Sequence, residues 1–103
     1  MSPPRHGAKR DFLVTYDICD PSRLRKVHKI MLGHGHPVQY SVFRCFLTPA
    51  RKMKLMSRLL KEINCREDQI ILFELGPADT ALTRPIEVLG VAMEGPKLGP
   101  SIF

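Results

Sequence analysis

The sequence contains no tryptophan, and only 7% of its residues are aromatic. Proteins that bind single-stranded nucleic acid by base stacking need exposed aromatic side chains, so the composition argues against that class. No apolar run approaches the roughly 20 residues of a membrane-spanning helix, and residues 1–10 have no apolar segment typical of a secretion signal. We therefore expect a cytoplasmic protein without membrane association.

Cysteine and histidine are also scarce, and their spacing disfavours a metal centre built from them. Cys19, Cys45 and Cys65 match no zinc pattern and cannot all pair with one another. His34 and His36 lie in a predicted loop with no cysteine or carboxylate nearby in the sequence. We expect free thiols in a reducing compartment.

Acidic residues are absent from the middle of the chain. Residues 21–61 contain no Asp or Glu but hold ten of the sixteen Lys and Arg residues, so this segment has a formal charge of +10 and the rest of the chain −4. Such segregation creates a field that attracts a polyanion, and nucleic acid is the commonest one. The alternative is a basic surface kept for solubility, which needs no separation of signs.

The pattern of apolar residues predicts one domain in which strands and helices alternate. Residues 12–18 are rich in β-branched and aromatic side chains and predict a strand. Capping residues followed by proline predict helices over 21–32 and 49–63. The expected core stripes are Leu24, Val27 and Met31 in the first helix, and Met53, Met56, Leu60 and Ile63 in the second.

Residues 36–47 form one extended segment that is long for a single strand. A hairpin or a bulge near residues 41–44 would divide it, and the sequence leaves both open. Residues 68–75 predict the next strand, and a short final strand is predicted near 86–91.

If the middle segment is a hairpin, the element order is that of an α+β, ferredoxin-like βαββαβ sandwich. We divide the chain into a basic N-terminal extension (1–11), the ferredoxin-like domain (12–75) and a C-terminal tail (76–103). Both helices would cover one face of the sheet, and the other face would expose side chains such as Leu13, Cys45 and Leu47. An exposed apolar face predicts a homodimer packed through its sheets.

Asp17 is the strongest candidate for chemistry, both as metal ligand and as catalytic residue. It lies near the end of the first strand, beside the start of a helix, where a carboxylate can hold Mg²⁺ (or Mn²⁺) next to a phosphate. In a symmetric dimer, two copies of Asp17 could share one metal ion. The alternative is that Asp17 and Asp20 only cap the helix, which we favour for Asp20 alone.

Five basic residues are predicted to bind nucleic acid through phosphates and not through bases. They are Arg23, Arg25, Lys26, Lys29 and Arg44.

Several segments taken together resemble the CRISPR-associated Cas2 family. They are Leu-Val-Thr-Tyr-Asp-Ile at 13–18, Arg-Lys-Val at 25–27, Val-Gln-Tyr-Ser-Val-Phe at 38–43 and Leu-Thr-Pro at 47–49. The resemblance covers about residues 12–75. It implies a ferredoxin-like fold and a two-fold dimer in which an extra C-terminal strand pairs with the sheet of the dimer partner.

The resemblance also implies a function in spacer acquisition. Family members hold double-stranded DNA through basic residues and bridge the CRISPR integrase, and several are described as metal-dependent nucleases on RNA or DNA. Asp17 matches the strand-end aspartate of those nucleases, and Ser41 and Phe43 match motif positions that shape the site together with Asp20. Pro21 replaces an acid that often follows Asp20, so nuclease activity and the choice between RNA and DNA stay open.

A third hypothesis is a non-catalytic, ferredoxin-like RNA-binding module. Such modules display stacking aromatic side chains on their central strands. Here the first strand offers Tyr16 beside Asp17, whose carboxylate repels phosphate unless a metal intervenes.

Overall fold

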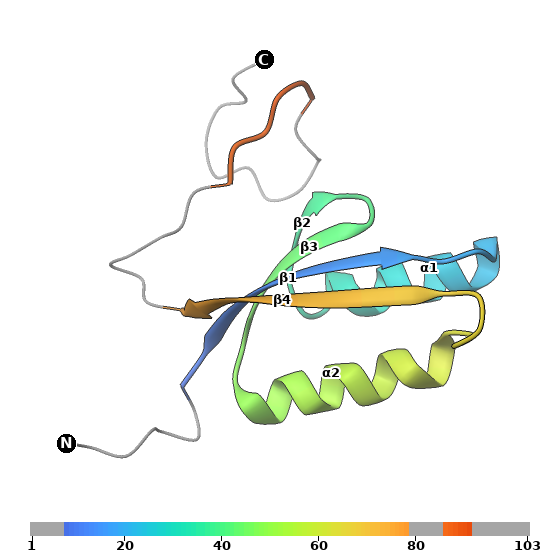
Figure 1. Ribbon diagram of the computed structural model, residues 1–103, viewed down its shortest axis with the longest axis horizontal. Coiled ribbons are helices and arrows are strands. Elements are labelled where there is room, and N and C mark those ends of the chain that lie inside the picture. The colour runs from blue at the N-terminus through green and yellow to red at the C-terminus, as the bar shows by residue number, and fades with distance from the viewer. Residues whose placement is uncertain (1–7, 79–85, 92–103) are drawn as a thin grey trace.

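The computed structural model describes residues 8–78 and 86–91 (Figure 1). The chain follows the order βαββαβ, with β1 (Arg10–Asp17), α1 (Pro21–Leu32), β2 (His36–Gln39), β3 (Val42–Leu47), α2 (Pro49–Glu62) and β4 (Gln69–Pro77). The strands form one antiparallel sheet in the order β2-β3-β1-β4. This is the predicted α+β, ferredoxin-like sandwich.

The extended segment is a hairpin and not a single bulged strand. β2 and β3 are joined by a turn at Tyr40 and Ser41, and their register shifts between Pro37 and Gln39. The connection from α1 into this hairpin passes very close to β3. A Cβ atom at Gly35 would lie 2.6 Å from the carbonyl oxygen of Arg44, so the path requires glycine.

The capping residues place both helices where the sequence predicts them. The Asp20 carboxylate accepts the backbone N–H of Arg23 at 2.9 Å, and the Thr48 hydroxyl accepts that of Arg51 at 3.2 Å. Each bond satisfies an N–H group that has no partner within the helix.

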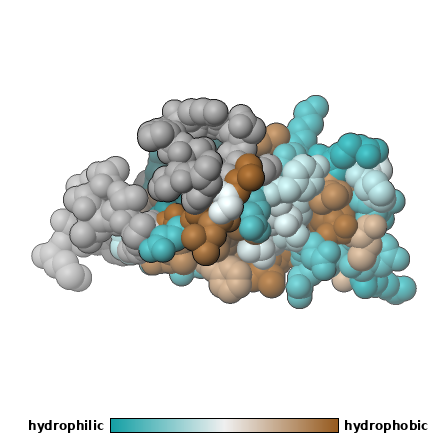
Figure 2. Space-filling view, turned by 90° about the horizontal axis from the view of Figure 1, so that it is seen from above, coloured by the Kyte–Doolittle hydropathy of each residue, from teal (hydrophilic) through white to brown (hydrophobic). Residues whose placement is uncertain are grey.

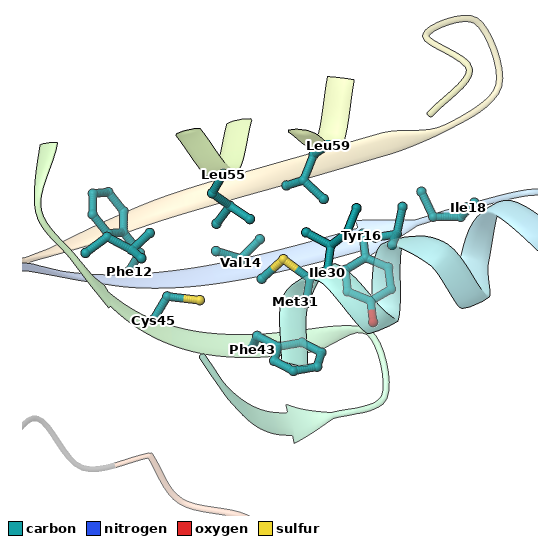
Figure 3. Close-up of a cluster of buried hydrophobic side chains, with 12 residues drawn as sticks. Phe12, Val14, Tyr16, Ile18, Ile30, Met31, Phe43, Cys45, Leu55 and Leu59 are labelled. Carbon is teal, nitrogen blue, oxygen red and sulfur yellow. The ribbon is translucent and has the colours of Figure 1, made fainter. Parts of the chain in front are cut away.

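One core lies between the sheet and the two helices (Figure 3). It contains the predicted face of β1 and residues of both helices, among them Val27, Ile30, Met31, Leu55 and Leu59. Cys45 and Leu47 also belong to it, so the expectation that they lie on the open face is wrong. Phe12 pairs with Cys45 and Val14 with Phe43, and residues opposite each other in a sheet share a face.

The predicted core stripe of the second helix is wrong for Met53, Met56 and Leu60, which are exposed, whereas Ile63 packs against the core as predicted. Leu55 and Leu59 are buried, whereas Met53 and Leu60 are 69% and 59% exposed. The helix has two apolar stripes on different sides, and periodicity alone cannot tell which one faces the sheet.

The predicted strand near 86–91 is absent from this single chain, because residues 86–91 have no regular structure. A strand is held by hydrogen bonds to a neighbouring strand, and pairing with a second subunit stays a prediction. In the part of the chain that the structure describes, no helix is long and apolar enough to cross a membrane.

Candidate nucleic-acid and metal site

Asp17 is the last residue of β1, and its side chain is exposed. It pairs across the sheet with Gln69, the first residue of β4. Its carboxylate makes no hydrogen bond or ion pair with any residue of 8–78 or 86–91. Asp17 therefore presents two free oxygen ligands at the strand end.

Asp20 and Asp68 lie close by in the fold, but their carboxylates are engaged. Asp20 caps α1, as the sequence predicts. Asp68 is a buried carboxylate that the sequence analysis missed, and it accepts the backbone N–H groups of Cys19 at 2.9 Å and Asn64 at 2.8 Å. No local pattern indicates this role, because two of its three partners, Cys19 and Arg23, are distant in the sequence.

Arg23 completes the environment of Asp68. Its Nε lies 2.8 Å from Asp68 Oδ2, and its Nη2 lies 3.2 Å from Oδ1 and 3.0 Å from Glu67 Oε1. The Arg23 guanidinium and the two backbone N–H donors hold the pKa of Asp68 far below its usual range, although burial opposes them. Arg23 is thus bound to two carboxylates instead of standing free for phosphate.

Arg44 is engaged in the same way at the other end of β1. It binds the buried Asp11 through two bonds, of 3.1 Å from Nε and 2.7 Å from Nη2. The side chains of Arg44 and Asp11 are only 13% and 2% exposed. This two-point geometry neutralises a buried carboxylate, so Arg44 is no free cation either.

The other three predicted cations on α1 are exposed. Arg25, Lys26 and Lys29 make no ion pair within the described residues. Lys26 and Lys29 line a groove of about 550 Å³ between the two helices, and Arg58 of α2 meets them there. Ile30, Gly33, His34 and Glu62 complete its lining. The groove therefore gathers three free cations from two helices.

Ser41 and Phe43 both contact Tyr16, the residue before Asp17 near the end of β1. The Ser41 carbonyl oxygen accepts the backbone N–H of Tyr16 at 3.0 Å. Phe43 is buried, with its ring 6.2 Å from that of Tyr16. The Tyr16 hydroxyl donates to the Tyr40 carbonyl oxygen at 2.6 Å and lies 2.8 Å from Nδ1 of His28.

These contacts fix the residue before Asp17. Because the single hydroxyl hydrogen of Tyr16 goes to Tyr40, His28 must supply a hydrogen from its Nδ1. Burial raises the pKa of Tyr16 well above its usual value, so Tyr16 is neutral and structural. It points into the core and cannot stack on a base.

The open face of the sheet carries four exposed apolar side chains, Phe46, Ile71, Phe73 and Leu75, beside the ion pair of Arg44 and Asp11. In the view of Figure 2, hydrophobic residues lie side by side near the middle of the molecule, and mostly hydrophilic ones lie toward the right-hand end. An exposed apolar face of this kind marks an interaction surface.

The chemistry of Asp17 fits a hard cation bound through oxygen. No group of three or more His, Cys, Asp or Glu side chains gathers among the residues that the structure describes, so one chain offers no closed metal cage. Mg²⁺ requires no such cage, because it binds one or two carboxylates and keeps several waters.

Residues 11–81 match the family described as CRISPR associated protein Cas2. The chain belongs to the Cas2 family. It is 39% identical over 94 residues to the CRISPR-associated endoribonuclease Cas2 1 of Rhodospirillum rubrum, which covers 91% of each chain. It is 41% identical over 64 residues to the Cas2 2 endoribonuclease of Thermodesulfovibrio yellowstonii, covering 62% of this chain and 70% of that relative.

Solved structures agree with this membership. The crystal structure of Streptococcus pyogenes Cas2 superposes with a TM-score of 0.67 at 38% identity, covering 78% of this chain and 99% of that one. A hypothetical protein of Thermus thermophilus gives a TM-score of 0.69 at 29% identity, covering 84% and 96%. The resemblance to the Cas2 family predicted from the sequence is confirmed.

Proposed function

We propose that this Cas2 chain forms a homodimer that binds the backbone of double-stranded DNA and bridges the CRISPR integrase during spacer acquisition. The observation that supports DNA binding is a cluster of exposed cations in and beside the groove between the helices, none of them in an ion pair with a described residue. They are Arg25, Lys26, Lys29 and Arg58. Two of the five cations predicted from the sequence, Arg23 and Arg44, are left out because carboxylates hold them.

The proposed contacts are with phosphates. Lysine and arginine side chains on the outside of helices act as charges for the backbone and carry no sequence information. Tyr16 and Phe43 are buried, and Tyr40 is stacked on His28. The exposed Phe46 and Phe73 lie on the open face of the sheet, which the proposed homodimer would cover, so few aromatic side chains would stay available for stacking on bases. Backbone binding of a duplex therefore fits the residues better than reading of single strands.

The proposed homodimer uses the open face of the sheet. Phe73 is 49% exposed and Phe46 38% exposed on that face, and a two-fold contact would remove both from water. The helix layer would then face outward in each subunit and stay accessible to DNA. A protein that is a monomer at micromolar concentration would instead favour the RNA-binding module, with Phe46 and Phe73 as stacking residues.

A second proposed activity is hydrolysis of a phosphodiester bond in RNA or DNA. It is supported by Asp17, whose exposed carboxylate has no bond to a described residue while those of Asp20 and Asp68 are engaged, and by the endoribonuclease names of the relatives. Asp17 from each subunit would hold Mg²⁺ or Mn²⁺. Such an ion, when bound, lowers the pKa of a water ligand and neutralises charge on the phosphoryl oxygens.

One experiment separates the two proposals. Purified protein and an Asp17→Asn variant are incubated with labelled single-stranded RNA and double-stranded DNA in Mg²⁺, and duplex binding is measured in parallel. If only the wild type cleaves nucleic acid and both proteins bind duplex DNA equally well, the result supports both DNA binding and metal-dependent hydrolysis. If neither protein cleaves and both bind duplex, the protein is a scaffold only, and if both cleave equally, Asp17 is not the metal ligand.

A further inference from the structure

We infer that Asp68 is a positioning residue for Asp17, holding the backbone that follows β1 in one place with the help of Arg23. The inference rests on the proposed phosphodiesterase activity. Asp68 itself would touch neither substrate nor metal. It acts through the main chain of Cys19, two residues beyond Asp17.

The segment between Asp17 and α1 is anchored at every residue. Asp17 pairs with Gln69, Ile18 is buried, and Asp20 caps the helix. Cys19 is held twice, because its N–H donates to Asp68 at 2.9 Å and its thiol donates to the Glu67 carbonyl oxygen at 2.9 Å. The side chain of Asp17 alone points outward without a partner in the described structure.

The pocket around Asp68 is built for an ionised carboxylate. Its two oxygens accept four hydrogen bonds from Cys19, Asn64 and Arg23, and its side chain has no exposed surface. An asparagine there has one oxygen, and its NH₂ group would face other donors. Asp68→Asn therefore keeps the volume of the side chain but loses the hydrogen bonds that one of the two carboxylate oxygens accepts.

Such a disruption would move Asp17 and with it the metal. An ion bound by one or two carboxylates takes its position from them, and a displacement of about 1 Å in a reacting group can reduce the rate about a hundredfold. A change at the other end of β1 should not displace Asp17 and should leave the cleavage rate unchanged.

The chain offers a matched control at the other end of the same strand. Asp11 is also a buried carboxylate with a two-point bond to an arginine, Arg44. It stands at the start of β1, whereas Asp17 stands at the end. Asp11→Asn thus removes a similar charge from a similar environment, away from the proposed metal site.

The test compares wild type, Asp68→Asn, Asp11→Asn and Asp17→Asn, at concentrations where all four are folded and in the same oligomeric state. The cleavage rate at saturating substrate and the affinity for Mn²⁺ alone are measured. We expect Asp68→Asn to cleave about ten- to a hundredfold more slowly than wild type and to bind Mn²⁺ more weakly, while Asp11→Asn matches wild type in both. Wild-type behaviour of Asp68→Asn, or equal losses in both variants, would overturn the inference.

Amide hydrogen exchange keeps the two proposals distinguishable. A wild type that neither cleaves nor binds Mn²⁺ would refute the phosphodiesterase proposal and with it any effect of Asp68 on a metal. Exchange at residues 18–20 tests the positioning step by itself. It should be faster in Asp68→Asn than in Asp11→Asn, and equal exchange in the two would refute the inference even if the wild type is an active nuclease.

Discussion

Loss of positive charge from the groove between α1 and α2 should change how duplex affinity depends on salt. Each phosphate neutralised by a protein cation contributes about −0.9 to the slope of log K against log salt concentration. Arg25, Lys26, Lys29 and Arg58 would make four such contacts in each subunit. The wild-type dimer should therefore show a slope of about −7, which corresponds to a loss of affinity of about 10⁴ between 50 and 200 mM salt.

The perturbation is the double substitution of Lys26 and Lys29 by glutamine. It removes two contacts from each subunit, so the slope should become less negative by about 3.6. Fluorescence anisotropy of a labelled duplex at several salt concentrations gives the slope for each protein. The matched control is the double substitution of Lys54 and Lys61 by glutamine, because both are exposed on α2 and neither lines the groove.

The reasoning fails if the slope of the Lys26 and Lys29 variant equals that of the wild type. It also fails if the control changes the slope by the same amount, since net charge would then account for binding without any particular surface. A change confined to the groove variant, with the same affinity for duplexes of different sequence, is the expected result for contacts with phosphates.

Three further outcomes follow from the fold. Leu55→Ala should lower the free energy of unfolding by about 2–5 kcal/mol in chemical denaturation. Leu60→Ala, at an exposed site of the same helix, should change it by less than about 0.5 kcal/mol. Equally small losses of stability in the two variants would show that Leu55 does not face the core. Phe73→Glu should convert the proposed dimer to a folded monomer in light scattering, and an unchanged molar mass would exclude the open sheet face as the interface. Because the pKa of Asp68 is depressed in the folded protein, its ionised form stabilises the fold above the unfolded pKa of about 3.9, and this contribution is lost as the pH falls further toward the folded value. The stability difference between wild type and Asp68→Asn should therefore be constant at neutral and weakly acidic pH and shrink below about pH 4; a difference that already shrinks near pH 6 would mean that Asp68 is not the group responsible.

The sequence predicted the elements well because their signals are local. Asp20 before Pro21 and Thr48 before Pro49 place the helix starts without reference to the rest of the chain. The alternation along β1 likewise assigns its buried face correctly. Signals of this kind depend on residues within one helical turn or one strand. Tertiary contacts therefore do not alter the elements that they predict.

The errors concern choices that only tertiary contacts make. α2 has apolar residues on two sides, and the side that meets the sheet is the one with Leu55 and Leu59. The faces of β3 depend in the same way on its register with β1, which places Cys45 opposite Phe12. In both cases the local pattern permits two answers, and the packing partner selects one.

Charge shows the same limit at the candidate site. Residues 21–61 hold no acid, yet two of their arginines are neutralised, because β1 brings Asp11 to Arg44 and the start of β4 brings Asp68 to Arg23. A count of basic residues therefore overestimates the cations available to a phosphate. What remains free lies on the helix layer, the apolar side chains lie on the open sheet face, and the free carboxylate of Asp17 lies at the strand end. Since these cations lie on the helix layer, away from the open sheet face and from Asp17, their substitution should weaken DNA binding without affecting the metal site, and Asp17→Asn should leave the salt dependence of duplex binding unchanged. Metal binding and dimerisation should not separate in this way, because the proposed ion is held by Asp17 from each subunit.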